Sequence, residues 1–277
     1  MSNITETRAV ADSRGPSAGN SSSARPAARS AVSGFWLPVA TLWQRELVRF
    51  WRQKSRVLGV VASPLVFWLL IGYGSGDLAR FFAGALVLTV LFSAIFSTIS
   101  IIEDRREGFL LSMLVSPAPR TSLVFGKILG SATLAWIQGL IFLAFAPLAG
   151  VSLTVTEVLE LIGAVFLVSF TLTGLGFVIA WRMDSTSGFH AIMNLLLVPM
   201  WMVSGSLFPL ATAHGWIKAL MWVNPLTYSI SLLNGFMKLG SGSPGISVSL
   251  AVTACFGGVL LLASGVVASQ KSLVSNA

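Results

Sequence analysis

Long apolar runs without charge alternate with short polar connections along most of this chain. Six runs are long enough to cross a bilayer. A spanning helix needs about 20 apolar residues, because in lipid every backbone group must find its hydrogen-bond partner within the helix. The pattern therefore predicts an all-α membrane protein with six spans. We expect these spans at residues 57–75, 81–102, 123–149, 158–181, 188–210 and 246–269.

Residues 35–56 precede the first span and show a different pattern. Tryptophan and aliphatic residues fall on one helical face, and arginine residues fall on the opposite face. We predict an amphipathic helix in the membrane interface, with tryptophan toward the acyl chains and arginine toward phosphates and the cytosol. Such a helix anchors the chain, and it can also act as a lever that touches a soluble partner. The expected interfacial residues are Trp36, Trp43, Arg45, Arg49, Trp51 and Arg52.

The segment 211–240 before the last span is apolar but interrupted by Gly, Pro and Asn. We predict short re-entrant helices that dip into the membrane, which is allowed where protein shields the backbone. A seventh span at Trp216–Phe236 is the alternative, but Lys218 and the Asn224-Pro225 step inside that range argue against it. The motif residues expected here are Phe208, Pro209, Asn224, Pro225 and Tyr228.

Basic residues are distributed unequally between the two ends of the spans. Six spans place both termini on one side, which then carries fifteen Lys and Arg residues against three on the opposite side. Cytoplasmic segments hold this excess, so we expect both termini and the loop 103–120 in the cytoplasm. Residues 1–34, rich in Ser, Ala and Arg, predict a disordered tail, with an organellar transit peptide as the alternative. Residues 271–277 predict a second short tail.

Composition agrees with a membrane protein. Of the 277 residues 55% are hydrophobic and only 10% are charged, whereas soluble domains carry about 25% charged residues. A net charge of +8 suggests nucleic acid as the partner of a soluble protein, but the positions of these charges indicate anionic lipid instead. We therefore expect the lipid bilayer, and no nucleic acid, as a partner. The single cysteine, Cys255, excludes an intrachain disulfide.

The chain lacks the motifs of an enzyme. Gly126-Lys127 is followed by Ile128 and has no upstream glycine, so it is not a phosphate-binding loop. The two histidines, His190 and His214, fall on opposite membrane faces by the predicted topology, and we expect no catalytic set and no metal site. The spans carry no central charge of the kind that ion-coupled carriers use. Energy for any transport is therefore expected from outside this chain.

Polar residues within the spans are candidates for a transport path. Three hydroxyl residues of the second span share one helical face, where they either line a path or support helix packing. An asparagine side chain without a hydrogen-bond partner is unfavourable in lipid, so we expect the asparagine of the fifth span to face the interior of the protein. Gly126 and Gly130 form a GxxxG pair that favours close helix packing over dimerisation. The path candidates are Thr89, Ser93, Ser97 and Asn194.

The loop 103–120 packs five charges of both signs before a Leu-rich segment and two prolines. The motifs of this loop are Glu107-Gly108 and Ser116-Pro117 with Arg120. Gly126-Lys127 with Leu129-Gly130 follows the loop. With Phe208-Pro209 and the later Asn224 to Tyr228 motif, the chain resembles the permease subunits of type-2 ATP-binding-cassette exporters over about residues 36–270. Phe109 departs from this family, which often has Thr there.

The resemblance implies two permeases paired with two ATPase subunits, a cytoplasmic coupling helix after the second span, and re-entrant helices before the sixth. ATP and Mg are then bound by the partner ATPase, and this chain holds no cofactor. Polar residues of the loop are expected to contact the ATPase, and its leucines to pack into the ATPase cleft or against the bundle. The alternative is a solvated loop. The expected coupling residues are Glu103, Asp104, Arg105, Arg106, Glu107, Gly108, Leu110, Leu111, Leu114, Ser116 and Pro117.

We thus expect a permease of the bacterial cytoplasmic (inner) membrane that exports a drug-like or lipid-like amphipathic substrate with a separate ABC ATPase and a second permease copy. The domain is expected at 57–270. Export of polysaccharide or lipo-oligosaccharide is one alternative. A carrier or channel working alone, or a membrane assembly scaffold, are alternatives of another class.

Overall fold

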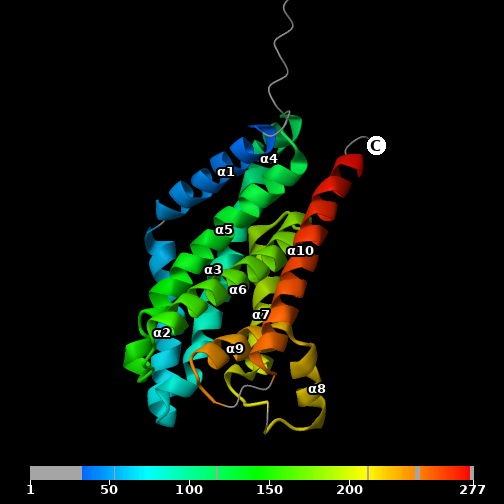
Figure 1. Ribbon diagram of the computed structural model, residues 1–277. Coiled ribbons are helices and arrows are strands. Elements are labelled where there is room, and N and C mark those ends of the chain that lie inside the picture. Colours follow the sequence, from blue (N-terminus) through cyan, green and yellow to red (C-terminus); the bar gives the residue numbers. More distant parts are fainter. Residues whose placement is uncertain (1–32, 53, 117, 211, 241–243, 275–277) are drawn as a thin grey trace, which may run out of the picture.

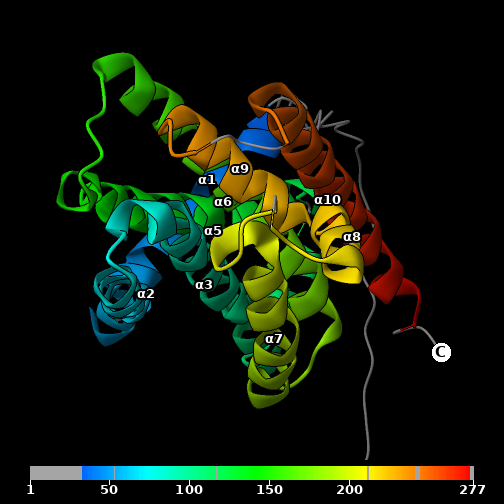
Figure 2. The same cartoon turned by 90° about the horizontal axis from the view of Figure 1, so that it is seen from below.

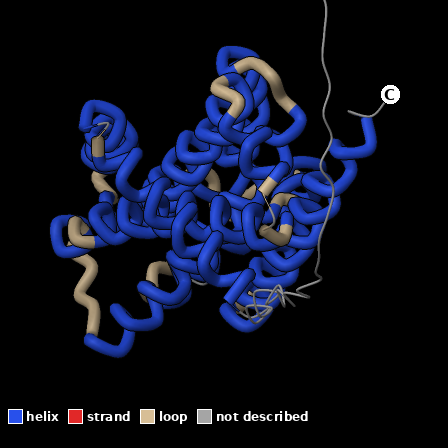
Figure 3. The backbone as a smooth tube through the Cα atoms, turned by 90° about the horizontal axis from the view of Figure 1, so that it is seen from above, coloured by secondary structure: helices blue, strands red, loops and turns tan. Residues whose placement is uncertain are grey.

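Helices joined by turns and loops make up the region that the computed structural model describes, which contains no strand (Figure 3). The predicted tails lie largely outside this region, although α1 already begins at Ser33 and α10 continues to Val274. The described residues are 33–52, 54–116, 118–210, 212–240 and 244–274, without the side chains of 33, 54–57, 114 and 270–274. The helices are α1 (Ser33–Trp51), α2 (Lys54–Ser75), α3 (Leu78–Arg106), α4 (Phe109–Val115), α5 (Arg120–Leu143), η1 (Ala146–Ala149), α6 (Val155–Arg182), α7 (Thr186–Trp201), η2 (Met202–Ser206), α8 (Gly215–Val223), α9 (Pro225–Phe236) and α10 (Ile246–Val274).

Six of the described helical stretches are long and apolar enough to cross a membrane, as the sequence predicts. The chain is therefore a multi-pass membrane protein. Most bounds differ from the prediction by a few residues, and two of these differences have consequences. The third span ends at Leu143, because Pro147 starts a 3₁₀ turn that Gly150 closes at φ 75°. The second span continues to Arg106, so it includes charges that were expected in a loop. The spans are Leu58–Ser75, Leu78–Arg106, Arg120–Leu143, Val155–Arg182, Thr186–Ser206 and Ile246–Ser269.

Helix α3 forms the centre of the bundle, in contact with α2, α5, α6 and α7 (Figure 2). Its sequence is almost entirely apolar or small, which is typical of a helix buried on all sides. An aromatic cluster fixes its start against neighbouring helices: the Trp68 ring lies 5.3 Å from Phe82 and 5.9 Å from Phe142. Trp68 Nε1 also donates to the Leu78 carbonyl at 2.9 Å, which satisfies its polar group.

The two ends of the bundle carry different elements. At one end α1 crosses α5 beside α4 and the C-terminal part of α10, and at the other end lie α8 and α9 (Figure 1). We call these the α4 end and the α8 end. In α5, a Cβ built on Gly126 lies 3.1 Å from the Val39 backbone, and one on Gly130 lies 2.9 Å from Glu46 Cβ. The predicted role of the glycine pair in close helix packing is confirmed, and the partner is α1.

Asn224 separates α8 from α9. Its side chain accepts from Leu226 N at 3.0 Å, which starts α9, and donates to the Met200 carbonyl at 2.5 Å, which ties this turn to α7. Tyr228 Oη donates to the Trp222 carbonyl at 2.8 Å across the same turn. The alternative of a seventh span is wrong, because the chain forms two short helices here. Re-entry of these helices into the membrane stays a prediction. Phe208 and Pro209 of the predicted motif are exposed.

Candidate functional site

Buried charged side chains join α1 to α3 and α5 near the α4 end. Asp104 in the last turn of α3 is 0% exposed, and its carboxylate accepts from Arg45 Nη2 at 2.8 Å and from Arg49 Nη1 at 2.9 Å. Lys127 of α5 donates to the same carboxylate and to Glu46 Oε1 at 2.7 Å. We call these five residues the buried charge cluster.

The charges of this cluster balance once Glu103 is included. Arg49 Nη2 donates to Glu103 Oε2 at 2.5 Å, so that three bases face three carboxylates. Pairing is essential here, because an isolated charge taken out of water costs several kcal/mol. Burial opposes the charge on Arg45, but the hydrogen bond and charge of Asp104 outweigh it and raise the pKa of the guanidinium. The cluster therefore holds α1 against α3 and α5.

These contacts correct two sequence-based expectations. Arg45 and Arg49 bind carboxylates of α3 instead of facing lipid phosphates. Asp104 does not present its carboxylate to a soluble partner, because the side chain is fully buried. Helical periodicity assigns residues to a face, but it does not reveal which helix meets that face. Trp43 Nε1 donates to Thr133 Oγ1 of α5 at 3.1 Å. The exposed members of the predicted interfacial set are Trp36, Trp51 and Arg52.

Helix α4 presents an apolar surface at the α4 end. Gly108, at φ 73°, turns the chain sharply out of α3, a conformation that glycine adopts without strain. Leu110 and Met113 are buried against the bundle. On the other face Leu111 is 66% exposed and Val115 is 80% exposed. Sequence reasoning missed Val115, although its spacing of four residues from Leu111 places both side chains on one face.

Charged residues next to α4 also bind the connection between α6 and α7. Arg105 Nη1 donates to Asp184 Oδ1 at 2.7 Å and to the Met183 carbonyl at 2.8 Å. Arg106 Nε donates to the Asp184 carbonyl at 3.1 Å, yet much of its side chain stays exposed. Pro117 and the side chain of Leu114 lie outside the described residues. The exposed members of the predicted coupling set are Arg106, Glu107, Gly108, Leu111 and Ser116.

A groove of about 690 Å³ runs between α2, α3 and α7, and we call it the α2/α7 groove. Aromatic rings line it: Phe92 stacks on Phe96 with ring centroids 5.8 Å apart, and His190 lies 5.3 Å from Phe96. Asn194 of α7 contributes an exposed amide, and Glu103 contributes its half-buried carboxylate. The lining thus joins a mostly apolar wall to a few polar groups, as in sites for small molecules.

The hydroxyl residues of α3 take a different position from Asn194. Thr89, Ser93 and Ser97 are buried inside the protomer. Thr89 donates to the Ala85 carbonyl at 2.9 Å, and Ser93 donates to Gln138 Oε1 at 2.5 Å. These contacts match the packing interpretation of the hydroxyl residues, and only Asn194 among the four path candidates lies at an open surface of the protomer.

Comparison with known proteins decides the family. The family model described as ABC-2 type transporter matches residues 38–238, which include α4, the buried charge cluster and the α2/α7 groove. The chain belongs to the ABC-2 type transporter family. It is similar to a transport permease of Cyanophora paradoxa, with 25% identity over 217 residues that cover 73% of this chain and 75% of the relative.

Two further relatives of this permease have names that refer to different processes. Nodulation protein J of Sinorhizobium fredii is 24% identical over 255 residues, covering 87% of this chain and 94% of the relative. A daunorubicin resistance ABC transporter permease of Streptomyces coeruleorubidus is 25% identical over 246 residues, covering 83% and 84%. Permeases of this family are membrane subunits, and the ATPase is a separate subunit.

Proposed function

We propose that this chain is the permease subunit of an ATP-driven exporter in a bacterial cytoplasmic membrane. Two copies pair with two ABC ATPase subunits, which bind ATP and Mg, and the complex moves a drug-like or lipid-like amphipathic molecule out of the cytoplasm. The observation that carries this proposal is α4, a short helix that offers Leu111 and Val115 to a partner beside exposed Arg106 and Glu107. Apolar anchors with a charged rim are typical of a protein interface.

The contacts of α4 supply a route for force. Its buried face packs on the bundle through Leu110 and Met113, and Gly108 connects it directly to α3. A displacement of α4 therefore reaches the last turn of α3, where Asp104 joins α1 and α5 through the buried charge cluster. In this proposal the partner's closure on ATP moves these three helices together, and the α4 end faces the cytoplasm.

A double substitution in α4 tests the proposal. Leu111→Glu with Val115→Glu places two carboxylates in the apolar contact, so we expect co-purification of the ATPase and ATP-dependent export to fall at least tenfold. Both side chains are exposed, so the thermal midpoint of the permease in detergent is expected to stay unchanged. Leu111→Met with Val115→Ile is the matched control and should retain export, because these changes preserve apolar volume. Export at the original rate in the charged variant would contradict coupling through α4.

The α2/α7 groove supports an amphipathic substrate. Phe92 stacks on Phe96, the His190 ring lies beside Phe96 at an interplanar angle of 49°, and Asn194 offers one amide for orientation. A polysaccharide chain would need many more hydrogen-bonding groups, so this lining favours the drug-like or lipid-like class over polysaccharide. The name of the daunorubicin resistance relative agrees with that choice. Transport by the purified permease without any ATPase, driven by a gradient, would instead support a carrier working alone.

Substitution of Phe96 tests the groove. Aromatic contacts contribute about 0.5–1.5 kcal/mol beyond buried area, so Phe96→Ala should raise the substrate concentration at half-maximal export about two- to tenfold. The measurement is uptake by inverted vesicles at several substrate concentrations. Ser97→Ala is the control on the same helix and should change little, since Ser97 is buried and bonds its own helix at Ala94. Equal effects of both variants would place the substrate elsewhere.

A further inference from the structure

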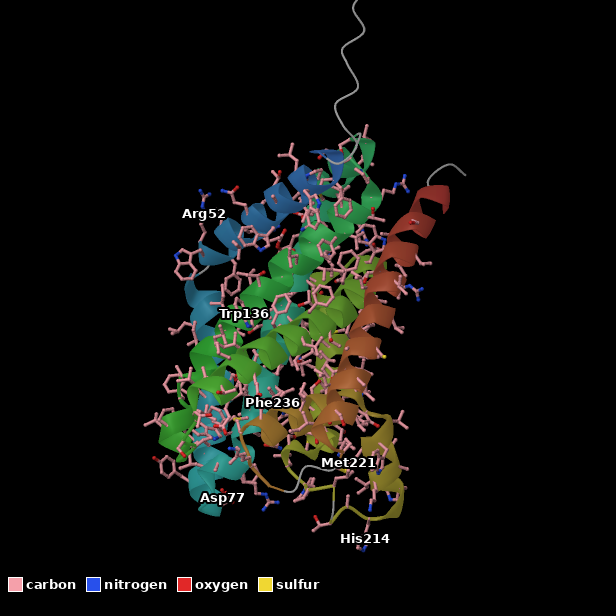
Figure 4. All side chains as sticks on the ribbon, viewed as in Figure 1. Arg52, Asp77, Trp136, His214, Met221 and Phe236 are labelled. Carbon is pink, nitrogen blue, oxygen red and sulfur yellow. The ribbon has the colours of Figure 1, made fainter. Side chains whose placement is uncertain are left out.

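A second, polar cavity of about 760 Å³ opens at the α8 end of the molecule. It lies between the start of α3, the turn after α7, one side of α9 and the residues that follow α9. Asp77, at the start of α3, lies at the same end of the molecule as His214 and Met221, and opposite Arg52 (Figure 4). The cavity is thus at the other end of the bundle from α4, and its volume is in the range of sites for drug-sized ligands.

Two polar atoms in the wall of this cavity lack hydrogen-bond partners. Thr227 Oγ1 and Asn234 Oδ1 are buried, and neither finds a partner among the described residues. Such groups are uncommon in folded proteins, where buried polar atoms are nearly always paired. Both residues line the cavity, and the two unpaired atoms are shielded from solvent in this conformation. Ser231, in the same wall, already donates to the Pro244 carbonyl at 2.6 Å.

The charged groups around the cavity nearly cancel. Lys238 is paired with Glu157 of α6, which holds the pKa of the Lys238 ammonium above its usual value. Arg80 and Asp77 contribute one charge of each sign, and the Asp77 carboxylate accepts from Arg80 N at 3.1 Å. A phosphate or carboxylate therefore gains little net attraction here. An uncharged ligand with several hydroxyl groups fits better, because each hydroxyl both donates and accepts.

We propose that this cavity binds the hydroxyl-rich, uncharged head group of an amphipathic molecule, of which a glycosyl group is the simplest example. The ligand's hydroxyls bond the Thr227 hydroxyl and the Asn234 amide, and its apolar part extends toward the membrane. The role of this cavity in export rests on the proposed function, because the cavity lies at the end of the bundle where a molecule exported from the α4 end would leave. Binding itself requires neither ATP nor an ATPase.

Photolabelling of the full-length permease tests this site. The probe is octyl glucoside with a diazirine on the sugar, added to the permease in phosphatidylcholine nanodiscs free of glycolipid. We expect saturable labelling that mass spectrometry maps to α9 or to the turn after α7. Dodecyl maltoside should compete, whereas dodecyldimethylamine oxide, which has the same alkyl chain without a sugar, should not. Labelling that does not saturate, or equal competition by both detergents, overturns the proposal.

Substitutions separate the site from the rest of the bundle. Thr227→Val and Asn234→Leu keep the side-chain size and should each reduce labelling at least fivefold. Thr173→Val is the matched control, since Thr173 Oγ1 is also buried without a partner among the described residues but lies outside the cavity lining, and it should label normally. If Asn234→Leu does not fold, Thr227→Val alone decides. Unchanged labelling in a folded Thr227→Val overturns the proposal.

A second arm identifies the source of the ligand. Labelling of the permease alone supports a head group that arrives from the surrounding bilayer. Labelling that appears only when the ATPase and Mg-ATP are added contradicts binding by the permease alone, and no labelling in either arm overturns the site. If the cavity does not bind the probe, the expected result of the α4 experiment does not change. If the α4 variant loses coupling, labelling without ATP is still expected. The two proposals can therefore be contradicted separately.

Discussion

The permease carrying Asp104→Ala is expected to lose most of its folded population in detergent. This substitution removes the carboxylate that accepts from Arg45, Arg49 and Lys127, so that these three bases face only the two carboxylates of Glu46 and Glu103. Breaking a buried ion pair by removing one partner costs about 3–5 kcal/mol, which is a large part of the stability of a typical protein. The thermal midpoint, followed by size-exclusion chromatography after heating, measures this loss.

Glu103→Gln is the matched control for Asp104→Ala, because Glu103 is one residue away but half-buried, and its carboxylate pairs with Arg49 among the described residues. A partly exposed pair contributes about 0–1 kcal/mol, so this variant should stay close to the unmodified permease. Adding Lys127→Met to Asp104→Ala should recover part of the loss, since it removes one unpaired charge. If Asp104→Ala and Glu103→Gln had the same midpoint, the buried charge cluster would not be what holds α1.

The second large effect is expected for Gly126→Leu in α5. A Cβ at Gly126 lies 3.1 Å from both Cα and the carbonyl oxygen of Val39, and these backbone atoms can move only if α1 moves as a whole. Overpacking of this kind costs about 1–3 kcal/mol, and a leucine adds three more carbon atoms beyond Cβ. We expect a clear fall in the thermal midpoint together with weaker attachment of α1.

Gly163→Leu in α6 provides the comparison, since nothing lies within 4 Å of a Cβ at that position. It should leave the thermal midpoint nearly unchanged. The two variants also separate packing within a protomer from dimerisation. If Gly126→Leu lowered the fraction of dimer but not the thermal midpoint, the glycine pair would lie in a contact between two copies. That result would contradict the packing of Gly126 on Val39.

Several features of this permease were predictable from local patterns. Residues 81–102 carry no charge and are long enough to span, and only a helix satisfies their backbone in lipid. The short helix after the second span is expected from the family resemblance of the loop motifs, and α4 lies there. The Asn224-Pro225 step predicts a helix start, since Asn caps a helix and Pro suits its first position.

Other features depend on contacts between residues far apart in the chain. Thr89 and Ser93 share a face with Ser97, but the sequence does not say whether that face meets α5 or an open path, and the structure places Ser93 against Gln138. The polar α8-end cavity has no local signal either, because its wall combines the start of α3 with the end of α9.

The sequence by itself determined the class of the protein and its six spans. These follow from hydrophobicity, helix length and backbone hydrogen bonding, which act over a few turns of chain. Tertiary structure alone decided that Asp104 is a buried partner of Arg45 and Lys127 and not a contact for the ATPase. A charge shows its role only through the groups that surround it, and here those groups come from helices separated by many residues in the chain.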